Sequence, residues 1–138
     1  MMQQQRVQDL MQPVPHPLRV EMPLSRAVDL ILQSGLTGLP VVDDANCVVG
    51  FVSEHDCIDY LVSGSYHCDS RTLVGDIMYR EPLCAAPTDS IIDLVQKMGS
   101  NKPKTWPVAK AGLLQGVISR RQIMRALNAS MQGCRSRV

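Results

Sequence analysis

Aromatic residues are scarce in this sequence of 138 residues. Phe, Trp and Tyr together make up 4%, whereas hydrophobic residues make up 45% and charged residues 20%. Non-specific binding of single-stranded nucleic acid relies on several exposed aromatic rings, so this composition argues against such a surface. The remaining balance is that of an ordinary globular protein. It predicts one small core, or two half-size units that share a core, built from aliphatic side chains.

Paired cysteines and long apolar segments are also missing. The five cysteines have no CxxC spacing, which argues against a zinc finger and against a disulfide framework. We therefore expect no bound metal and a reducing compartment. No segment approaches the ~18 consecutive apolar residues of a spanning helix, and the N-terminal sequence MMQQQRVQD has no apolar signal region. The sequence predicts a cytoplasmic protein without a membrane partner.

The common short enzyme motifs are absent as well. The sequence contains no GxxxxGKS/T, GxGxxG, HExxH or GxSxG pattern, so we predict no enzymatic activity. The sequence alone does not exclude a nucleophilic pair formed by Cys57 and a distant histidine. Helical spacing places Cys57 on an inward face, where thiols are usually inert.

The two halves of the sequence carry opposite charge. Residues 1–61 contain three arginines and eight acidic residues, a net charge of −5, and residues 62–138 contain eleven basic and five acidic residues, a net charge of +6. The total of +1 is therefore a cancellation. The near-neutral total charge disfavours a basic surface for nucleic acid along the whole chain. A cationic patch in the second half would instead suit a small phosphate-bearing ligand.

The sequence repeats itself at an offset of 67 residues. Seven positions are identical without a gap: Val7 and Val74, Asp9 and Asp76, Met11 and Met78, Pro15 and Pro82, Val28 and Val95, Pro40 and Pro107, and Val41 and Val108. After a one-residue deletion, the match continues through Gly50 and Gly116, Ser53 and Ser119, and Leu61 and Leu127. This duplication predicts a first repeat at 6–62, a linker at 63–72, a second repeat at 73–131, and a tail at 132–138 in which Arg135 and Arg137 are disordered.

Each copy has the pattern of an α/β (α+β) unit with the order β-α-β-β-α. We expect strands at 18–20, 39–42 and 47–52, and again at 84–86, 106–109 and 113–118, with short apolar turns at 7–11 and 73–78 ahead of them. One helix precedes each hairpin, and another follows it at Ser53 or Ser119. A unit of this size cannot bury both faces of its sheet, so the two copies should pack sheet to sheet about a pseudo-twofold axis.

Helical spacing predicts which side chains are buried. The helix before each hairpin has an apolar face of Leu24, Ala27, Val28, Ile31 and Leu32, or of Ile91, Leu94, Val95 and Met98. The helix after each hairpin is expected to bury Cys57, Ile58, Leu61 and Val62, or Ile123, Met124, Leu127 and Met131. Trp106 and Met78 are also expected in the core, and Gly35 is expected to end its helix in a left-handed conformation.

Three motifs carry a resemblance to a known family. They are Asp9-Leu10-Met11, Gly38-Leu39-Pro40-Val41-Val42-Asp43 and Gly50-Phe51-Val52-Ser53-Glu54-His55-Asp56, and degenerate copies follow in the second repeat. Together with the repeat order, they resemble a tandem pair of CBS domains, or Bateman module, of the stand-alone type, over residues 6–131. The resemblance implies a regulatory, non-catalytic module that forms a homodimer through its helices. It also implies an adenosine-containing ligand in the cleft between the repeats: AMP, ADP or ATP, and in some members S-adenosylmethionine or NAD.

The family signature places an aspartate three residues after Ser or Thr, where its carboxylate accepts hydrogen bonds from the ribose hydroxyls. Ser53 and Asp56 match this signature, and a carboxylate suits a cis-diol because it only accepts hydrogen bonds. The same spacing is also a helix-capping pattern, and the two roles are compatible. Gln122 stands at the corresponding position of the second copy, so the resemblance implies one site, centred on Asp56.

Further ligand contacts are implied by the same resemblance. Leu36, Thr37 and Gly38 would form one wall, Phe51 the base, Leu83 and Cys84 the adenine contact, and His55, Lys104 and Arg121 the phosphate contacts. Each residue also has a plainer interpretation, as part of a strand or of a solvated polar surface. Arg120 and Arg121 oppose the dipole of the helix that they begin, which is unfavourable unless an anion lies nearby.

Two functions remain open from the sequence. In the first, an adenine nucleotide binds between the repeats and changes how the module associates with itself or with an unidentified regulated protein. In the second, Gln122 marks a nucleotide site that has decayed, and the chain is a scaffold for oligomerisation or partner docking.

Overall fold

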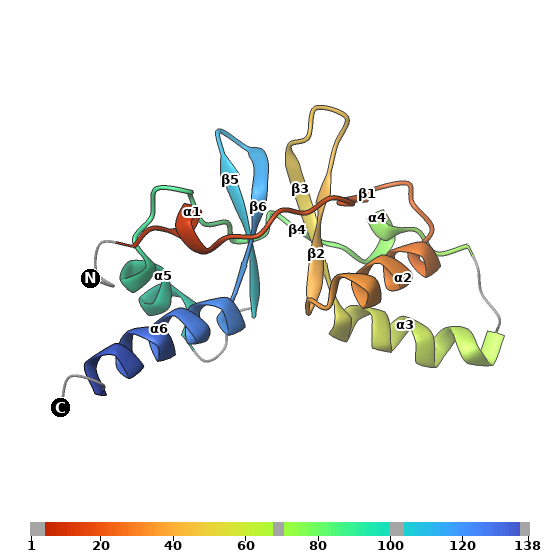
Figure 1. Cartoon of the computed structure of the whole chain (residues 1–138). Coiled ribbons are helices and arrows are strands. Elements are labelled where there is room, and N and C mark those ends of the chain that lie inside the picture. The colour runs from red at the N-terminus through yellow and green to blue at the C-terminus, as the bar shows by residue number, and fades with distance from the viewer. Residues whose placement is uncertain (1–4, 68–70, 100–103, 136–138) are drawn as a thin grey trace.

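The computed structural model of the chain describes residues 5–67, 71–99 and 104–135 (Figure 1). The first half contains α1 (Val7–Leu10), β1 (Leu18–Arg19), α2 (Leu24–Ser34), β2 (Gly38–Val42), β3 (Val48–Ser53) and α3 (Glu54–His67). The second half contains α4 (Val74–Ile77), β4 (Tyr79–Arg80), α5 (Ile91–Met98), β5 (Thr105–Lys110), β6 (Leu113–Ser119) and α6 (Arg120–Arg135). This order confirms a mixed helix and strand fold built from a repeated unit.

Two sheets meet at the middle of the molecule, and the first of them includes β4 of the second half (Figure 1). The first sheet has the order β1-β2-β3-β4, with β1 parallel to β2 and the other pairs antiparallel. The second sheet is the antiparallel hairpin β5-β6. The predicted strand at 84–86 is reduced to one parallel bridge between Ala85 and Val108. Since β2 contacts β5, the sheets of the two repeats pack against each other as predicted.

The two halves exchange short segments at their N-terminal ends. Val7 of α1 is fully buried in the core of the second half, and Val74 of α4 is fully buried in the core of the first half. Gln12 donates to and accepts from the backbone of Val117 in β6, both at 2.9 Å, and β4 pairs with β3. The sequence did not predict this exchange, because apolar spacing indicates burial without indicating which core receives the side chain.

The helix before each hairpin buries most of its predicted apolar face. Buried side chains include Leu24, Ala27 and Ile31 on α2, and Ile91, Leu94 and Met98 on α5. Leu32 is 75% exposed and Val95 is 39% exposed, so their predicted burial was wrong, and Leu30 is buried in place of Leu32. Trp106 and Met78 are buried as predicted. Gly35 ends α2 with a φ of 72°, the expected left-handed conformation.

The helices after the hairpins bury much less than predicted. Cys57 on α3 and Ile123 on α6 are buried, and Leu127 is partly buried. Five other side chains expected in the core are 48–63% exposed, and for these the prediction was wrong: Ile58, Leu61, Val62, Met124 and Met131. Each of these helices contacts one strand of its hairpin and one neighbouring helix, α2 for α3 and α1 for α6, so only part of its surface is covered.

Both α3 and α6 continue beyond the predicted repeat boundaries. The first runs to His67, inside the predicted linker, and the second runs to Arg135, inside the predicted tail. Arg135 is therefore helical rather than disordered, and Arg137 lies outside the described residues. Each extension contains one glycine, Gly64 or Gly133, and a single glycine costs a helix only ~1 kcal/mol relative to alanine.

Candidate functional site

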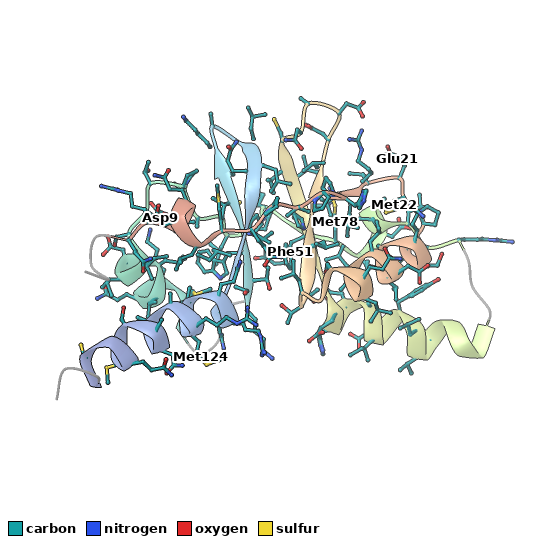
Figure 2. The ribbon with its side chains drawn as sticks, viewed as in Figure 1. Asp9, Glu21, Met22, Phe51, Met78 and Met124 are labelled. Atoms are coloured by element: carbon teal, nitrogen blue, oxygen red, sulfur yellow. The ribbon has the colours of Figure 1, made fainter. Side chains whose placement is uncertain are left out.

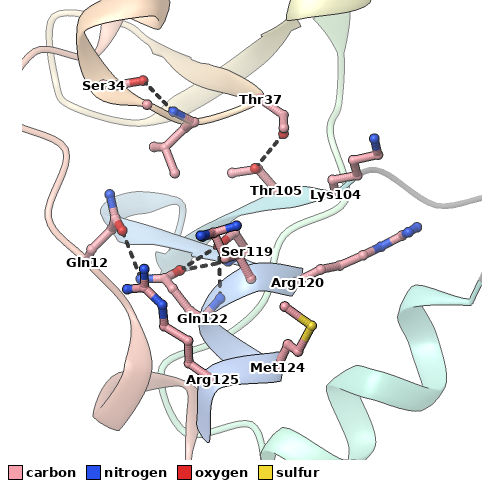
Figure 3. A pocket seen from close by; sticks show the side chains of 13 residues that line it. Gln12, Ser34, Thr37, Lys104, Thr105, Ser119, Arg120, Gln122, Met124 and Arg125 are labelled. Carbon is pink, nitrogen blue, oxygen red and sulfur yellow. Dashed lines mark hydrogen bonds between the residues drawn. The ribbon is translucent and has the colours of Figure 1, made fainter. Parts of the chain in front are cut away.

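A cavity of about 500 Å³ lies between the two halves, where the N-terminus of α6 faces the segment that joins α2 to β2 (Figure 3). The first half contributes Gln12, Ser34, Gly35, Leu36 and Thr37 to its lining. The second half contributes Lys104, Thr105, Ser119, Arg120, Arg121, Gln122, Met124 and Arg125. Both repeats are therefore needed to form the cavity.

The α2–β2 segment is shaped by local hydrogen bonds. The Ser34 hydroxyl donates to the carbonyl of Ile31 at 2.7 Å and accepts from the N–H of Leu36 at 3.1 Å. This closes the end of α2 and directs the following residues toward the second half. The hydroxyl oxygens of Thr37 and Thr105 are 2.7 Å apart, so one hydrogen bond joins the two halves at the cavity wall (Figure 3).

Positive charge dominates the cavity. Its lining includes Lys104, Arg120, Arg121 and Arg125, and none of the described residues that line it is acidic. Arg120 donates from Nη2 to the carbonyl of Gly99 at 3.2 Å. The first turn of α6 contains no acidic residue, and the N-terminal end of a helix itself carries a partial positive charge. The cavity therefore favours an anion.

Both the oxygen and the nitrogen of the Gln122 side-chain amide form hydrogen bonds within the protein. Its Oε1 accepts from the N–H of Ser119 at 2.8 Å and from the Ser119 hydroxyl at 3.2 Å. Its Nε2 donates to the carbonyl of Leu10 at 3.1 Å and to Oε1 of Gln12 at 2.9 Å. Leu10 and Gln12 belong to the exchanged N-terminal segment. Gln122 thus ties that segment to the first turn of α6 (Figure 3).

A second cavity, of about 540 Å³, adjoins the first. The two share Gln12, Ser34 and Leu36. The remaining lining residues are mostly apolar and include no Lys, Arg, Asp or Glu among those described: Pro13, Val14, Pro15, His16, Leu30, Gln33 and Leu39. An apolar compartment therefore lies directly beside a cationic one.

The structure divides the predicted site residues into two groups. Leu36, Thr37, Lys104 and Arg121 line the cationic cavity. The others are not among its lining residues: Gly38, Phe51, Ser53, His55, Asp56, Leu83 and Cys84. Their contact with a ligand stays a prediction.

Asp56 caps the start of α3, as the spacing allowed. Its Oδ2 accepts from the Ser53 hydroxyl at 2.9 Å and from the Ser53 N–H at 3.3 Å, and the Asp56 N–H donates to the Ser53 hydroxyl oxygen at 3.3 Å. No described residue forms a hydrogen bond with the other carboxylate oxygen, Oδ1. His55 Nε2 lies 4.0 Å from Oδ2 of Asp59, and both side chains are exposed.

Gly38 and Phe51 pack against each other. A Cβ atom on Gly38 would lie 2.5 Å from the Val52 carbonyl oxygen and 2.6 Å from Cε1 of Phe51, so only glycine leaves room for the ring. Phe51 is buried, near the middle of the molecule (Figure 2). Leu83 and Cys84 are exposed, and the Cys84 thiol lies 3.5 Å from the carbonyl oxygen of Pro82.

Nine of the thirteen lining residues were not among the ligand contacts that the resemblance implied, although the sequence analysis had linked Arg120 to a nearby anion. They are Gln12, Ser34, Gly35, Thr105, Ser119, Arg120, Gln122, Met124 and Arg125. The duplication contained part of the signal, because Ser119 and Gln122 correspond to Ser53 and Asp56. Gln12 carried no such signal, because its position depends on the exchange of N-terminal segments.

The Cys57 side chain is buried, as its inward position suggested. Burial raises its pKa to about 11, and the nearby carboxylates of Asp56 and Glu54 add to the shift. The thiol is therefore protonated at neutral pH, which disfavours a nucleophilic role. Within the described ranges, no group of three His, Cys, Asp or Glu side chains is placed to hold a metal ion. None of the described helices is long and apolar enough to cross a membrane.

Two repeated units that share a cavity define a paired-repeat module. The sequence model of the CBS domain family matches residues 7–63 and 74–129. The chain belongs to the CBS domain family, and the resemblance carried by its motifs is confirmed.

Known proteins share both sequence and fold with this chain. The chloroplastic CBS domain-containing protein CBSX2 of Arabidopsis thaliana is 28% identical over 137 residues, which covers 80% of this chain and 58% of that protein. The crystal structure of CBSX2 in complex with AMP has a TM-score of 0.77, with 91% of this chain and 98% of that chain covered, at 28% identity. The CBS domain pair of protein MJ0100, in complex with 5-methylthioadenosine and S-adenosyl-L-methionine, has a TM-score of 0.77 at 18% identity, with 91% and 98% covered. The chain spans 32–64% of the length of the curated relatives that it matches.

Proposed function

We propose that this chain is a non-catalytic regulatory module that binds an adenine nucleotide, AMP, ADP or ATP, between its repeats. The observation that carries the proposal is the pair of adjoining cavities, one lined by four cations and the other mostly by apolar side chains. A nucleotide has the same division, because its phosphates are anionic and its purine is a flat ring with apolar faces. Cofactor sites typically combine an apolar lining with a few placed polar groups.

This division suggests an orientation for the nucleotide. The phosphates would lie against Arg121 and Arg125 at the start of α6, where backbone N–H groups and the helix dipole also attract anions. The base would lie beside Val14 and Leu39 in the adjoining cavity. Leu36 lines both cavities and would mark the boundary between base and phosphates.

The comparisons support an adenosine-type ligand in general terms. CBSX2, which is 28% identical, was crystallised with AMP. S-adenosylmethionine carries a cationic sulfonium group, which the four cations of the cavity would repel. The charge of the cavity therefore favours a nucleotide with phosphates over that ligand.

Asp56 remains proposed as a ribose contact. Its Oδ1 atom has no hydrogen-bond partner among the described residues, and a carboxylate oxygen can accept hydroxyl donors. In the arrangement implied by the family, its companions would be Gly38, Phe51, Ser53, His55, Leu83 and Cys84. This site would be separate from the cavity that Gln122 lines.

Self-association through α3 and α6 is the second part of the proposal. These helices present five apolar side chains that are 48–63% exposed: Ile58, Leu61, Val62, Met124 and Met131. Exposed apolar surface of this kind marks protein–protein contacts, and we propose a homodimer through these helices. A ligand shifts such an equilibrium only by its different affinity for the two states. α6 begins at the cavity and carries part of the exposed apolar surface, so it would connect ligand binding to self-association.

The same apolar surface favours a second candidate function, a scaffold for oligomerisation or docking that does not use a nucleotide. The regulated partner would be an unidentified protein in either case. We retain a cytoplasmic location as a prediction, and the relative CBSX2 is named a chloroplastic protein.

A thermal-shift panel of AMP, ADP, ATP, NAD and S-adenosylmethionine separates these functions. A ligand at 100 times its dissociation constant should stabilise the folded chain by ~2.7 kcal/mol. We expect a shift with at least one of the phosphate-bearing ligands. If no ligand of the panel changes the melting temperature, the scaffold is the better account.

A further inference from the structure

All the hydrogen-bonding capacity of Gln122 is used inside the protein. A side-chain amide has two acceptor positions on its oxygen and two N–H donors. Ser119 occupies both acceptor positions, and Leu10 and Gln12 take both donors. Backbone partners fix the orientation of the amide, because the Ser119 N–H can only donate and the Leu10 carbonyl can only accept.

The corresponding residue of the first repeat is bonded differently. Ser53 occupies only Oδ2 of Asp56, and Oδ1 has no partner among the described residues. The carboxylate of Asp56 thus keeps an oxygen for a hydroxyl donor, whereas the amide of Gln122 does not. The side chain at this position of the second repeat therefore has a different role, because it holds the N-terminal segment.

No other described lining residue replaces the missing carboxylate. The hydroxyls of the cavity wall are already bonded, Ser34 to its own helix end and Thr37 to Thr105. The acceptors left for a ligand are therefore uncharged oxygens, such as Oε1 of Gln12, whereas Lys104, Arg121 and Arg125 are donors only. Charged donors form their strongest hydrogen bonds with phosphate and carboxylate oxygens.

We propose that this cavity selects a nucleotide by its base and its phosphates and leaves the ribose 2′-hydroxyl unrecognised. Ribonucleotides and 2′-deoxyribonucleotides then bind to it with closely similar affinity. The inference rests on the proposed function, because it assigns the sugar selectivity of the same site. Gln122 is then a specificity-determining residue, because its amide has no free acceptor for the ribose 2′-hydroxyl.

Calorimetric titration with ATP and with 2′-deoxy-ATP tests the inference. The chain should carry Asp56→Asn, which removes the first-repeat carboxylate and leaves an amide oxygen for Ser53. The two dissociation constants should differ by less than about fivefold, below the tenfold step that ~1.4 kcal/mol produces. ATP binding that is tighter by fivefold or more would overturn the inference and leave the proposed function standing. Failure of both nucleotides to bind to the Asp56→Asn chain would overturn the inference, and failure of ATP to bind to the wild-type chain as well would overturn the proposed function itself.

A second variant reverses the selectivity. Gln122→Asp, in the same Asp56→Asn background, restores an acceptor-only carboxylate at the start of α6. The preference for ATP over 2′-deoxy-ATP should then rise to about tenfold, as expected when a charge-assisted hydrogen bond is regained. Both ligands carry the same triphosphate, so repulsion of the phosphates by the new carboxylate cancels in this ratio. An unchanged ratio in a variant with a native circular dichroism spectrum would show that residue 122 does not set the sugar selectivity.

Discussion

The side-chain amide of Gln122 donates a hydrogen bond to the side-chain oxygen of Gln12 at 2.9 Å, across 110 residues of sequence. This bond connects the first turn of α6 to the N-terminal segment, whose Val7 is buried in the core of the second half. Both glutamines also line the cationic cavity. A ligand against the start of α6 would therefore lie next to the anchor of the exchanged segment.

Removing this bond should weaken the anchor. We expect Gln12→Ala to lower the free energy of unfolding by about 1 kcal/mol, because Nε2 of Gln122 loses one of its two acceptors. Urea denaturation measures the change. Gln8→Ala is the matched control, since Gln8 lies on α1 with an exposed side chain and does not line the cavity. Equal losses in the two variants would contradict this role of Gln12.

The exchange of segments predicts that two equivalent valines stabilise opposite halves. Val7→Ala and Val74→Ala should each lower the free energy of unfolding by about 2 kcal/mol, because each side chain is fully buried in the core of the other repeat. Val95→Ala should cost less, since its side chain is 39% exposed. Denaturant unfolding compares the three variants. A loss at Val7 no larger than that at Val95 would argue against the exchange.

The exposed helix faces predict self-association. Leu61→Glu on α3 and Met131→Glu on α6 place a charge in the proposed interface, and each should convert the proposed homodimer to a monomer in size-exclusion chromatography with light scattering. Leu113→Glu is the control, because Leu113 is 41% exposed at the start of β6, outside these helices. A mass unaffected by the two helix variants would contradict the proposed interface.

The buried thiol predicts slow alkylation. The pKa of Cys57 is raised from 9.0 to about 11, so the folded chain keeps the thiol protonated where the unfolded chain loses the proton. The resulting contribution to stability is complete below pH 9 and is lost as the pH rises to about 11. At pH 8, iodoacetamide followed by mass spectrometry should therefore label Cys57 much more slowly than the exposed Cys134. Similar labelling rates would show that the Cys57 thiol is accessible and ionised.

The repeated pattern predicted much of the fold. The matching positions of Pro, Gly and Ser in the two halves indicated two repeated units. Residue preferences at helix ends and in cores correctly placed Gly35 in its left-handed cap and Trp106 in the core. Periodicity failed at Leu32 and Ile58, because it shows that a helix face is apolar and not how much of that face a small sheet covers. The exchange at Val7 depends on contacts between distant segments, which local patterns do not contain.

The candidate site was only partly predictable for the same reason. Leu36, Thr37, Lys104 and Arg121 were implied by the resemblance to CBS domains, and all four line the cavity. The importance of Gln122 was underestimated, because a change from carboxylate to amide suggests a lost site when its partners are unknown. Its partners, Leu10 and Gln12, come from the other end of the chain and became visible only in the structure.

Calorimetric titration of ATP into the double variant Lys104→Ala/Arg121→Ala tests the central claim most directly. The matched control is Arg26→Ala/Lys97→Ala, which removes two exposed charges that do not line the cavity and so leaves the same net charge. We predict saturable ATP binding to the wild-type chain and to the control, and binding at least about tenfold weaker in the first variant, since charge-assisted hydrogen bonds contribute ~1.5–3 kcal/mol each. Equal affinity in the two double variants, or no binding to the wild-type chain, would contradict a nucleotide site in the cationic cavity.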